Sequence, residues 1–153
     1  MEKWQPPKAG FFKVNFDTAI RESFSVQAAI CCDSKGKIIK AVSQFNPSCD
    51  PTYGEALAAS LAISLSLPVF TLEGDSLTVI LALQSPIPSQ YWKIADLISD
   101  TISLLSVSHS WEAHKVNKSA SFYAHYVPYW ATAISYSGCI PTFFSILKFY
   151  THM

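Results

Sequence analysis

The stretch that decides the fold is WQPPKAGFFKVNFDTA, residues 4–19. Its two adjacent prolines exclude a helix, so residues 1–10 are expected to form an extended lead that ends at a glycine. From Phe11 to Ala19 apolar and polar side chains alternate, which is typical of a strand with one buried face. The pattern predicts a first β-strand that carries Asp17 near its end.

Two further strands are predicted in a hairpin after this one. Ser25–Cys32 is rich in β-branched and small apolar residues, and a turn sequence at Asp33–Lys37 separates it from the next such run, Ile38–Phe45. Asn46–Thr52 contains two prolines and polar residues, which predict a loop. Three antiparallel strands are therefore expected first.

The rest of the chain switches between helical and strand-like patterns. The run GEALAASLAISLSL, residues 54–67, consists mostly of good helix formers, and its helix is expected to end at Pro68. A strand, two helices, a strand and a helix are expected next: Val69–Leu72, a helix capped by Asp75 or Ser76, Trp92–Leu105, Val107–Val116 and Ser119–Ala133. The order βββ-α-β-α-α-β-α predicts an α/β fold with a mixed five-stranded sheet and helices on its faces.

Composition bounds the class of protein. The 153 residues, half of them apolar, suffice for one domain with a core, and the 11 basic and 11 acidic residues balance. No global positive field attracts nucleic acid, so any such binding must be local. The four cysteines form no zinc-site spacing and are expected to be reduced thiols. The absence of a signal pattern or a long apolar run predicts a soluble intracellular protein without a membrane span.

Three carboxylates stand in settings from which they can converge. Asp17 ends the first strand, Glu55 lies in the first helix, and Asp75 follows the fourth strand. If the first and fourth strands are neighbours and the first helix packs across them, the three form an oxygen-rich site suited to Mg²⁺ or Mn²⁺. Two such ions, about 3.5–4 Å apart, support in-line phosphoryl displacement. Each acid also has a structural alternative: a solvated strand end, a first-turn helix residue and an N-cap.

The opening stretch resembles the plant reverse-transcriptase-like ribonuclease H domain, whose pattern is W-x-P-P-x-x-G-x-x-K-x-N-x-D. All seven specified positions agree, from Trp4 to Asp17. GEALAASLAISLSL is similar to the family's E-A-x-A-A helix, LEGDS to its E-x-D-S turn, and KVNKSASFYAHYVPYWA to its last helix. The resemblance extends from Trp4 to about Pro141. The domain itself is expected at residues 11–133, followed by an apolar tail at residues 134–153.

The resemblance implies an RNase H fold and hydrolysis of the RNA strand of an RNA–DNA hybrid. It implies that Asp17, Glu55 and Asp75 bind two Mg²⁺ or Mn²⁺ ions, with His125 at the position of a fourth ligand, where it either ligates weakly or moves a proton. The alternative for His125 is an ordinary polar residue on the last helix. The expected nucleic-acid contacts are Lys13, Asn15, Ser76, Lys115 and Lys118. Trp92 and Trp111 are expected in the core.

Two other readings stay open, and departures from the family pattern favour the first of them. Lys118 replaces an arginine and so lacks its bidentate fork, and Pro128 is expected to kink the last helix at a cost of about 3 kcal/mol. One alternative is therefore a binding module with weak or no activity. The other is a fragment of a retroelement-derived protein. The apolar tail is expected to pack on the domain or to contact a partner domain or protein.

Overall fold

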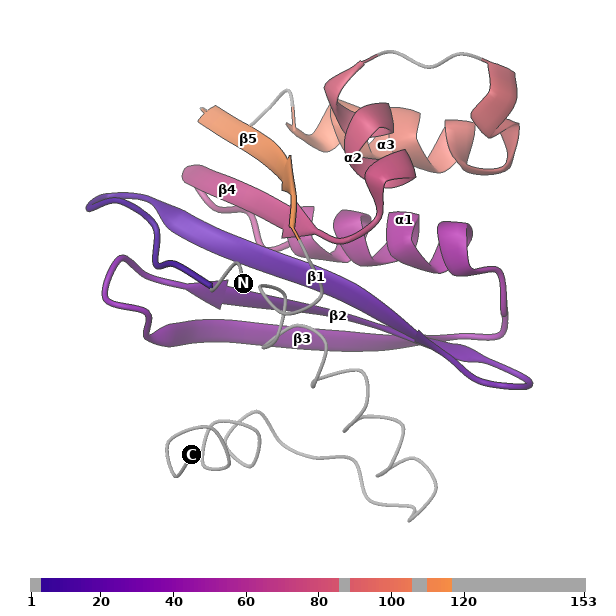
Figure 1. The fold of residues 1–153 in the computed structure, drawn as a ribbon, viewed down its shortest axis with the longest axis horizontal. Helices are drawn as coiled ribbons and strands as arrows, with labels where there is room; N and C mark the ends of the chain where they lie inside the picture. Colours follow the sequence, from indigo (N-terminus) through magenta and orange to yellow (C-terminus); the bar gives the residue numbers. More distant parts are fainter. Residues whose placement is uncertain (1–3, 86–88, 106–109, 117–153) are drawn as a thin grey trace.

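The computed structural model describes residues 4–85, 89–105 and 110–116, which form a mixed sheet with helices on one side (Figure 1). The five strands lie in the order β3-β2-β1-β4-β5. Their bounds are β1 Phe12–Ile20, β2 Ser25–Cys32, β3 Ile38–Asn46, β4 Val69–Gly74 and β5 Ser110–Lys115. The described helices are α1 Pro51–Ile63, α2 Leu77–Gln84, the 3₁₀ helix η1 Ser89–Ile94 and α3 Ala95–Leu105.

Strand pairing confirms the predicted sheet. β2 pairs antiparallel with both β1 and β3, while β4 pairs parallel with β1 and β5. Because β1 and β4 are parallel neighbours, their carboxyl-terminal ends meet at the same edge of the sheet. Asp17 lies near this end of β1, and Asp75 directly follows β4.

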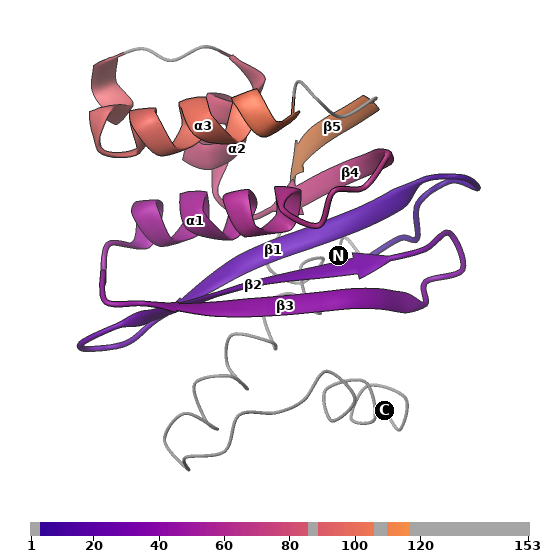
Figure 2. The same ribbon diagram turned by 180° about the vertical axis from the view of Figure 1, so that it is seen from behind.

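The core lies between the sheet and the described helices, which cover one face of the sheet (Figures 1 and 2). α1 lies mainly over β1 and β2, and it also contacts α3 and, to a lesser extent, β4. The alternation of β1 puts Val14 and Phe16 into this core, where neither is exposed. On the opposite face, a smaller apolar cluster packs against Trp4 and contains Ala28, Ile30 and Cys32.

The bounds of α1 differ from the prediction at both ends. The helix begins at Pro51, inside the predicted loop, because Asp50 caps it with its side chain and a proline at the first position has no N–H to satisfy. It ends at Ile63, five residues before Pro68. Beyond Ile63 the chain tightens into i→i−3 hydrogen bonds, and Ser66 takes a left-handed conformation with φ 54°.

The helical segment before β5 also differs from the prediction. Trp92 was expected on the buried stripe of one continuous helix, but η1 precedes α3, and the 3₁₀ geometry turns Trp92 outward, leaving it 72% exposed. Trp111, by contrast, is partly buried against the core, as predicted. In the described ranges, no helix is both long and apolar enough to cross a membrane.

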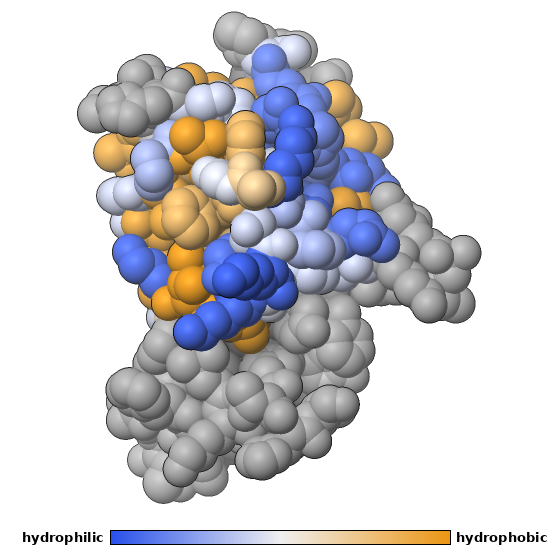
Figure 3. Space-filling view, turned by 90° about the vertical axis from the view of Figure 1, so that its left-hand side faces the viewer, coloured by the Kyte–Doolittle hydropathy of each residue, from blue (hydrophilic) through white to orange (hydrophobic). Residues whose placement is uncertain are grey.

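The surface at one end of the molecule mixes hydrophilic and hydrophobic residues (Figure 3).

Three predictions fall outside the described residues: the final helix Ser119–Ala133, the tail at residues 134–153 and the domain boundary at residue 133. The domain boundaries therefore stay predictions.

Candidate metal centre

The pairing of β1 with β4 brings two of the three acids together. Asn15 is the partner of Glu73 in the parallel register, and two residues further along each strand come Asp17 and Asp75. The ring of Phe16 on β1 also lies against Gly74, the last residue of β4. Two acids 58 residues apart in the sequence therefore become neighbours at one sheet edge.

The amino-terminal half of α1 supplies the third acid. Asp50 fixes the start of this helix by accepting a hydrogen bond from the Tyr53 N–H at 2.9 Å. Gly54 then lies so close to Thr18 that a Cβ on it would be 2.8 Å from Thr18 Oγ1. A glycine at this position lets the helix approach β1, and the next residue, Glu55, reaches over the end of the strand.

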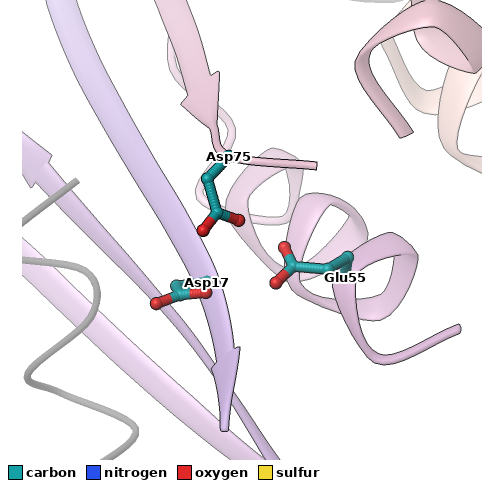
Figure 4. Close-up of side chains that lie close together, drawn as sticks. All are labelled: Asp17, Glu55 and Asp75. Carbon is teal, nitrogen blue, oxygen red and sulfur yellow. The ribbon is translucent and has the colours of Figure 1, made fainter. Parts of the chain in front are cut away.

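Asp17, Glu55 and Asp75 form one cluster, in which each residue offers a carboxylate oxygen and these oxygens all lie within 4.8 Å of one another. Figure 4 shows the three carboxylates facing a common point from β1, from α1 and from the turn after β4. Asp17 is only 4% exposed, and one of its oxygens accepts a hydrogen bond from the Thr18 N–H at 2.8 Å. The convergence predicted from the sequence is present.

The geometry weakens the structural alternative for each acid. Asp17 is buried and not a solvated strand end. Glu55 is the fifth residue of α1 and lies beyond the first turn, where the helix dipole acts most strongly. Ser76, not Asp75, caps α2, because Ser76 Oγ accepts a hydrogen bond from the Val79 N–H at 3.4 Å.

The electrostatics of the cluster favour a bound cation. Burial, together with the neighbouring charges of Asp17 and Asp75, raises the pKa of Glu55 to about 10. Among the described residues, Glu55 Oε2 is buried without a hydrogen-bond partner. A carboxylate held in this way beside two others is stabilised when a cation binds. Three carboxylates suit a hard divalent ion such as Mg²⁺ or Mn²⁺, so the residues fit the predicted metal.

Among the residues predicted to contact nucleic acid, the structure buries two and leaves others at the surface. Lys13 and Asn15 are buried, and both bind Glu73: Lys13 Nζ lies 2.9 Å from Glu73 Oε1, and Asn15 Nδ2 donates to Glu73 Oε2 at 3.1 Å. Both side chains thus have a role inside the fold, and their contact with nucleic acid stays a prediction. Sequence reasoning gave Glu73 no role, although its place two residues before Asp75 matches that of Asn15 before Asp17.

The other predicted contacts are less buried or not described. Lys115 is exposed at the end of β5, where it pairs with Gly74, one residue from Asp75. Ser76 is half-buried as the cap of α2. Lys118 and His125 lie outside the described residues, so the fourth position of the site stays a prediction.

Comparisons with known proteins agree with this architecture. A family model described as reverse transcriptase-like matches residues 15–127, whereas no curated protein matches significantly. The structure is similar to RNase H1 from the halophilic archaeon Halobacterium salinarum NRC-1, with a TM-score of 0.68 and 17% identity over 74% of this chain and 90% of that one.

Two other solved structures are similar as well. The N-terminal RNase H domain of a Mycobacterium tuberculosis protein has a TM-score of 0.73 and 13% identity over 84% of this chain and 99% of that one. LC11-RNase H1, isolated from compost and solved in complex with an RNA/DNA hybrid, has a TM-score of 0.61 and 11% identity over 70% of this chain and 86% of that one. At these identities the likeness establishes an RNase H-like fold.

Proposed function

Because this chain belongs to the reverse transcriptase-like family, we propose that it is a metal-dependent phosphodiester hydrolase that cleaves the RNA strand of RNA–DNA hybrids. The observation that carries the proposal is the cluster of Asp17, Glu55 and Asp75 at one edge of an RNase H-like sheet. A relative in fold has been solved with an RNA/DNA hybrid, which supports this substrate class.

The proposed site uses the three carboxylates to hold two Mg²⁺ or Mn²⁺ ions. When bound, such ions supply Lewis-acid stabilisation of the phosphate and lower the pKa of a bound water. Asp17 is held by β1 and the Thr18 N–H, while the close contact of Gly54 with Thr18 sets the position of Glu55. The protein contributes preformed ligands on a strand, a helix and a strand end, so little reorganisation is needed for binding.

The proposal for the fourth ligand position of the site is based on the sequence alone. His125 stands where the family pattern has an aspartate or a histidine. A neutral imidazole adds no negative charge and is a poorer ligand for Mg²⁺ than a carboxylate, so we propose that His125 ligates weakly or moves a proton. Low activity is the expected consequence, and a His125→Asp variant is expected to raise it.

Substrate contacts are proposed to be few and local. Lys115 is exposed beside the end of β4, and Lys118 follows three residues later. With a net charge of zero, binding depends on these local charges, on duplex shape and on the 2′-hydroxyls. Weak, strongly salt-dependent binding is therefore expected. A partner domain or protein, contacted through the apolar tail, is the proposed source of further affinity.

An end-labelled RNA–DNA hybrid tests the activity, with double-stranded RNA and double-stranded DNA as comparisons. Cleavage of the RNA strand is expected in Mg²⁺ or Mn²⁺ and is lost in a chelator, in Asp17→Asn and in Glu55→Gln. Glu112→Gln is the matched control, because Glu112 is an exposed acid on β5 outside the cluster. Cleavage by wild type no faster than by Asp17→Asn rejects the enzymatic proposal.

A binding module without catalysis is the alternative, favoured by the histidine at the fourth position. It predicts that the hybrid is bound without being cleaved. In that case Glu55→Gln leaves the dissociation constant for the hybrid unchanged, whereas a fall in hybrid affinity together with metal affinity in Glu55→Gln contradicts this alternative.

A further inference from the structure

A chain of buried polar side chains runs across β1 and β4 next to the metal centre. Trp4 Nε1 donates to Asn15 Oδ1 at 2.9 Å, and Asn15 Nδ2 donates to Glu73 Oε2 at 3.1 Å. The other carboxylate oxygen of Glu73 forms an ion pair with Lys13 Nζ at 2.9 Å, and Lys13 also donates to the carbonyl of Gln5. Asn15, Lys13 and Glu73 are exposed by 1%, 8% and 8%, so these bonds form away from bulk water.

Donor and acceptor chemistry fixes how the Asn15 side chain is oriented in this row of hydrogen bonds. The indole N–H of Trp4 can only donate, so the amide of Asn15 presents its oxygen to Trp4 and its N–H₂ to Glu73. Both oxygens of Glu73 are then used, one by an amide and one by an ammonium group. The positive charge of Lys13 balances the negative charge of Glu73, so the pair adds no net charge beside the metal ligands.

The same hydrogen-bonded side chains fix how β1 and β4 are aligned. Asn15 and Glu73 are register partners; Asp17 follows Asn15 by two residues on β1, and Asp75 follows Glu73 by two residues, just past the end of β4. A slip of one residue moves one strand by about 3.3 Å along the other and reverses the faces of its side chains. Such a slip breaks the Asn15–Glu73 bond, leaves buried polar groups without partners and separates two ligands whose cluster spans at most 4.8 Å.

We propose that Asn15 and Glu73 are positioning residues for the metal centre: their hydrogen bond locks the β1–β4 register and so sets the separation of Asp17 and Asp75. Neither residue belongs to the carboxylate cluster. The inference rests on the proposed function insofar as the cluster is a metal site. The alignment of the strands can be measured without any metal.

Two variants separate the hydrogen bond from the charges. Asn15→Leu removes the amide and leaves Glu73 with Lys13 alone. The pair Lys13→Met with Glu73→Gln removes both charges together but keeps an oxygen that accepts from Asn15. Ile98→Ala is the stability control, because Ile98 is fully buried in α3, away from the cluster. Mn²⁺ affinity is measured by titration calorimetry on the full chain, at a temperature where every variant is folded.

Asn15→Leu is expected to weaken Mn²⁺ binding by about tenfold, the usual effect of losing a residue that orients a ligand. Lys13→Met with Glu73→Gln, and Ile98→Ala, are expected to bind Mn²⁺ within about threefold of wild type. In the metal-free protein, nuclear Overhauser effects between β1 and β4 are expected to weaken or change register in Asn15→Leu and to persist in the other two variants.

The outcomes distinguish the two proposals. If wild type binds Mn²⁺ and Asp17→Asn does not, but Asn15→Leu binds as wild type does, the positioning role is wrong and the metal site stands. An equal loss in Asn15→Leu and Ile98→Ala also overturns positioning, because destabilisation alone then explains the effect. If wild type and Asp17→Asn both fail to bind Mn²⁺, the proposed function fails. The β1–β4 register in Asn15→Leu then decides the positioning inference, and an unchanged register rejects it.

Discussion

The ring of Phe16 lies directly over the backbone of Gly74. A Cβ built on Gly74 would be 2.7 Å from Cε2 and 2.8 Å from Cε1 of this ring, and closer still to Cζ. Phe16 is completely buried, so the ring has little room to move. Since Asp17 and Asp75 each follow one of these residues, this contact also limits how closely the backbones that carry the two acids approach each other.

Replacing Gly74 by alanine is therefore expected to overpack the core. Gly74→Ala should lower the free energy of unfolding by about 1–3 kcal/mol, measured by urea denaturation. Phe16→Leu shortens the side chain that a Cβ would meet, so the double variant should lose less stability than the sum of the single variants. Strict additivity would show that the ring does not limit this position.

The approach of α1 to β1 can be tested in the same way. Gly54→Ala places a methyl group 2.8 Å from Thr18 Oγ1 and 3.2 Å from Thr18 Cγ2, which should push the start of the helix outward. Glu55 then moves away from Asp17, and Mn²⁺ affinity should fall by about tenfold. Thr18→Ala removes both atoms, and the double variant is expected to regain most of the lost affinity. Affinity in Gly54→Ala equal to that of wild type would contradict this arrangement.

The raised pKa of Glu55 predicts how stability depends on pH when no metal is bound. The pKa is about 10 in the folded protein against an ordinary value of 4.5, so between these values the folded state binds one proton more than the unfolded state. The free energy of unfolding should therefore fall as pH rises from about 5 to 9, by at most about 1.4 kcal/mol per pH unit from this group.

Glu55→Gln should abolish this contribution, because glutamine does not titrate. Urea denaturation of both proteins in a chelator, at several pH values, gives the difference directly. The metal-free variant should be the more stable of the two at pH 8, and its advantage should shrink when saturating Mg²⁺ binds wild type. A difference between the two proteins that does not change with pH would show that Glu55 keeps an ordinary pKa.

The cysteines should differ in reactivity. Burial raises the pKa values of Cys31 and Cys32 to about 12 each, and Asp33 raises both further toward this value; the Cys32 thiol also raises the pKa of Cys31. Cys49, by contrast, is exposed. Since the thiolate is the reactive form, iodoacetamide at pH 8 should label Cys49 within minutes and leave Cys31 and Cys32 unlabelled until the protein is unfolded. Peptide mass spectrometry separates the sites. Labelling of Cys31 at the rate of Cys49 in the native protein would show that β2 is not buried as described.

Much of the fold follows from local patterns in the chain. The alternation in Phe11–Ala19 predicted β1, and the turn at Asp33–Lys37 predicted the hairpin, because strand periodicity and turn chemistry act over a few residues. The helix ends were less predictable. α1 stops at Ile63 rather than at Pro68 because the serines that follow form their own short turns, and η1 exposes Trp92 because its geometry departs from a 3.6-residue period.

The sequence by itself determined which residues make up the proposed site: the three carboxylates, their places at a strand end, in a helix and after a strand, and the pattern that surrounds them. Only the tertiary structure decided that these acids meet within 4.8 Å, that Glu55 is buried with a raised pKa, and that Lys13 and Asn15 bind Glu73 inside the fold. The physical reason is that side-chain type and periodicity are local properties of the chain. The distances between the acids, the burial of Glu55 and the binding of Asn15 to Glu73 arise from packing between segments 20 to 58 residues apart in the sequence.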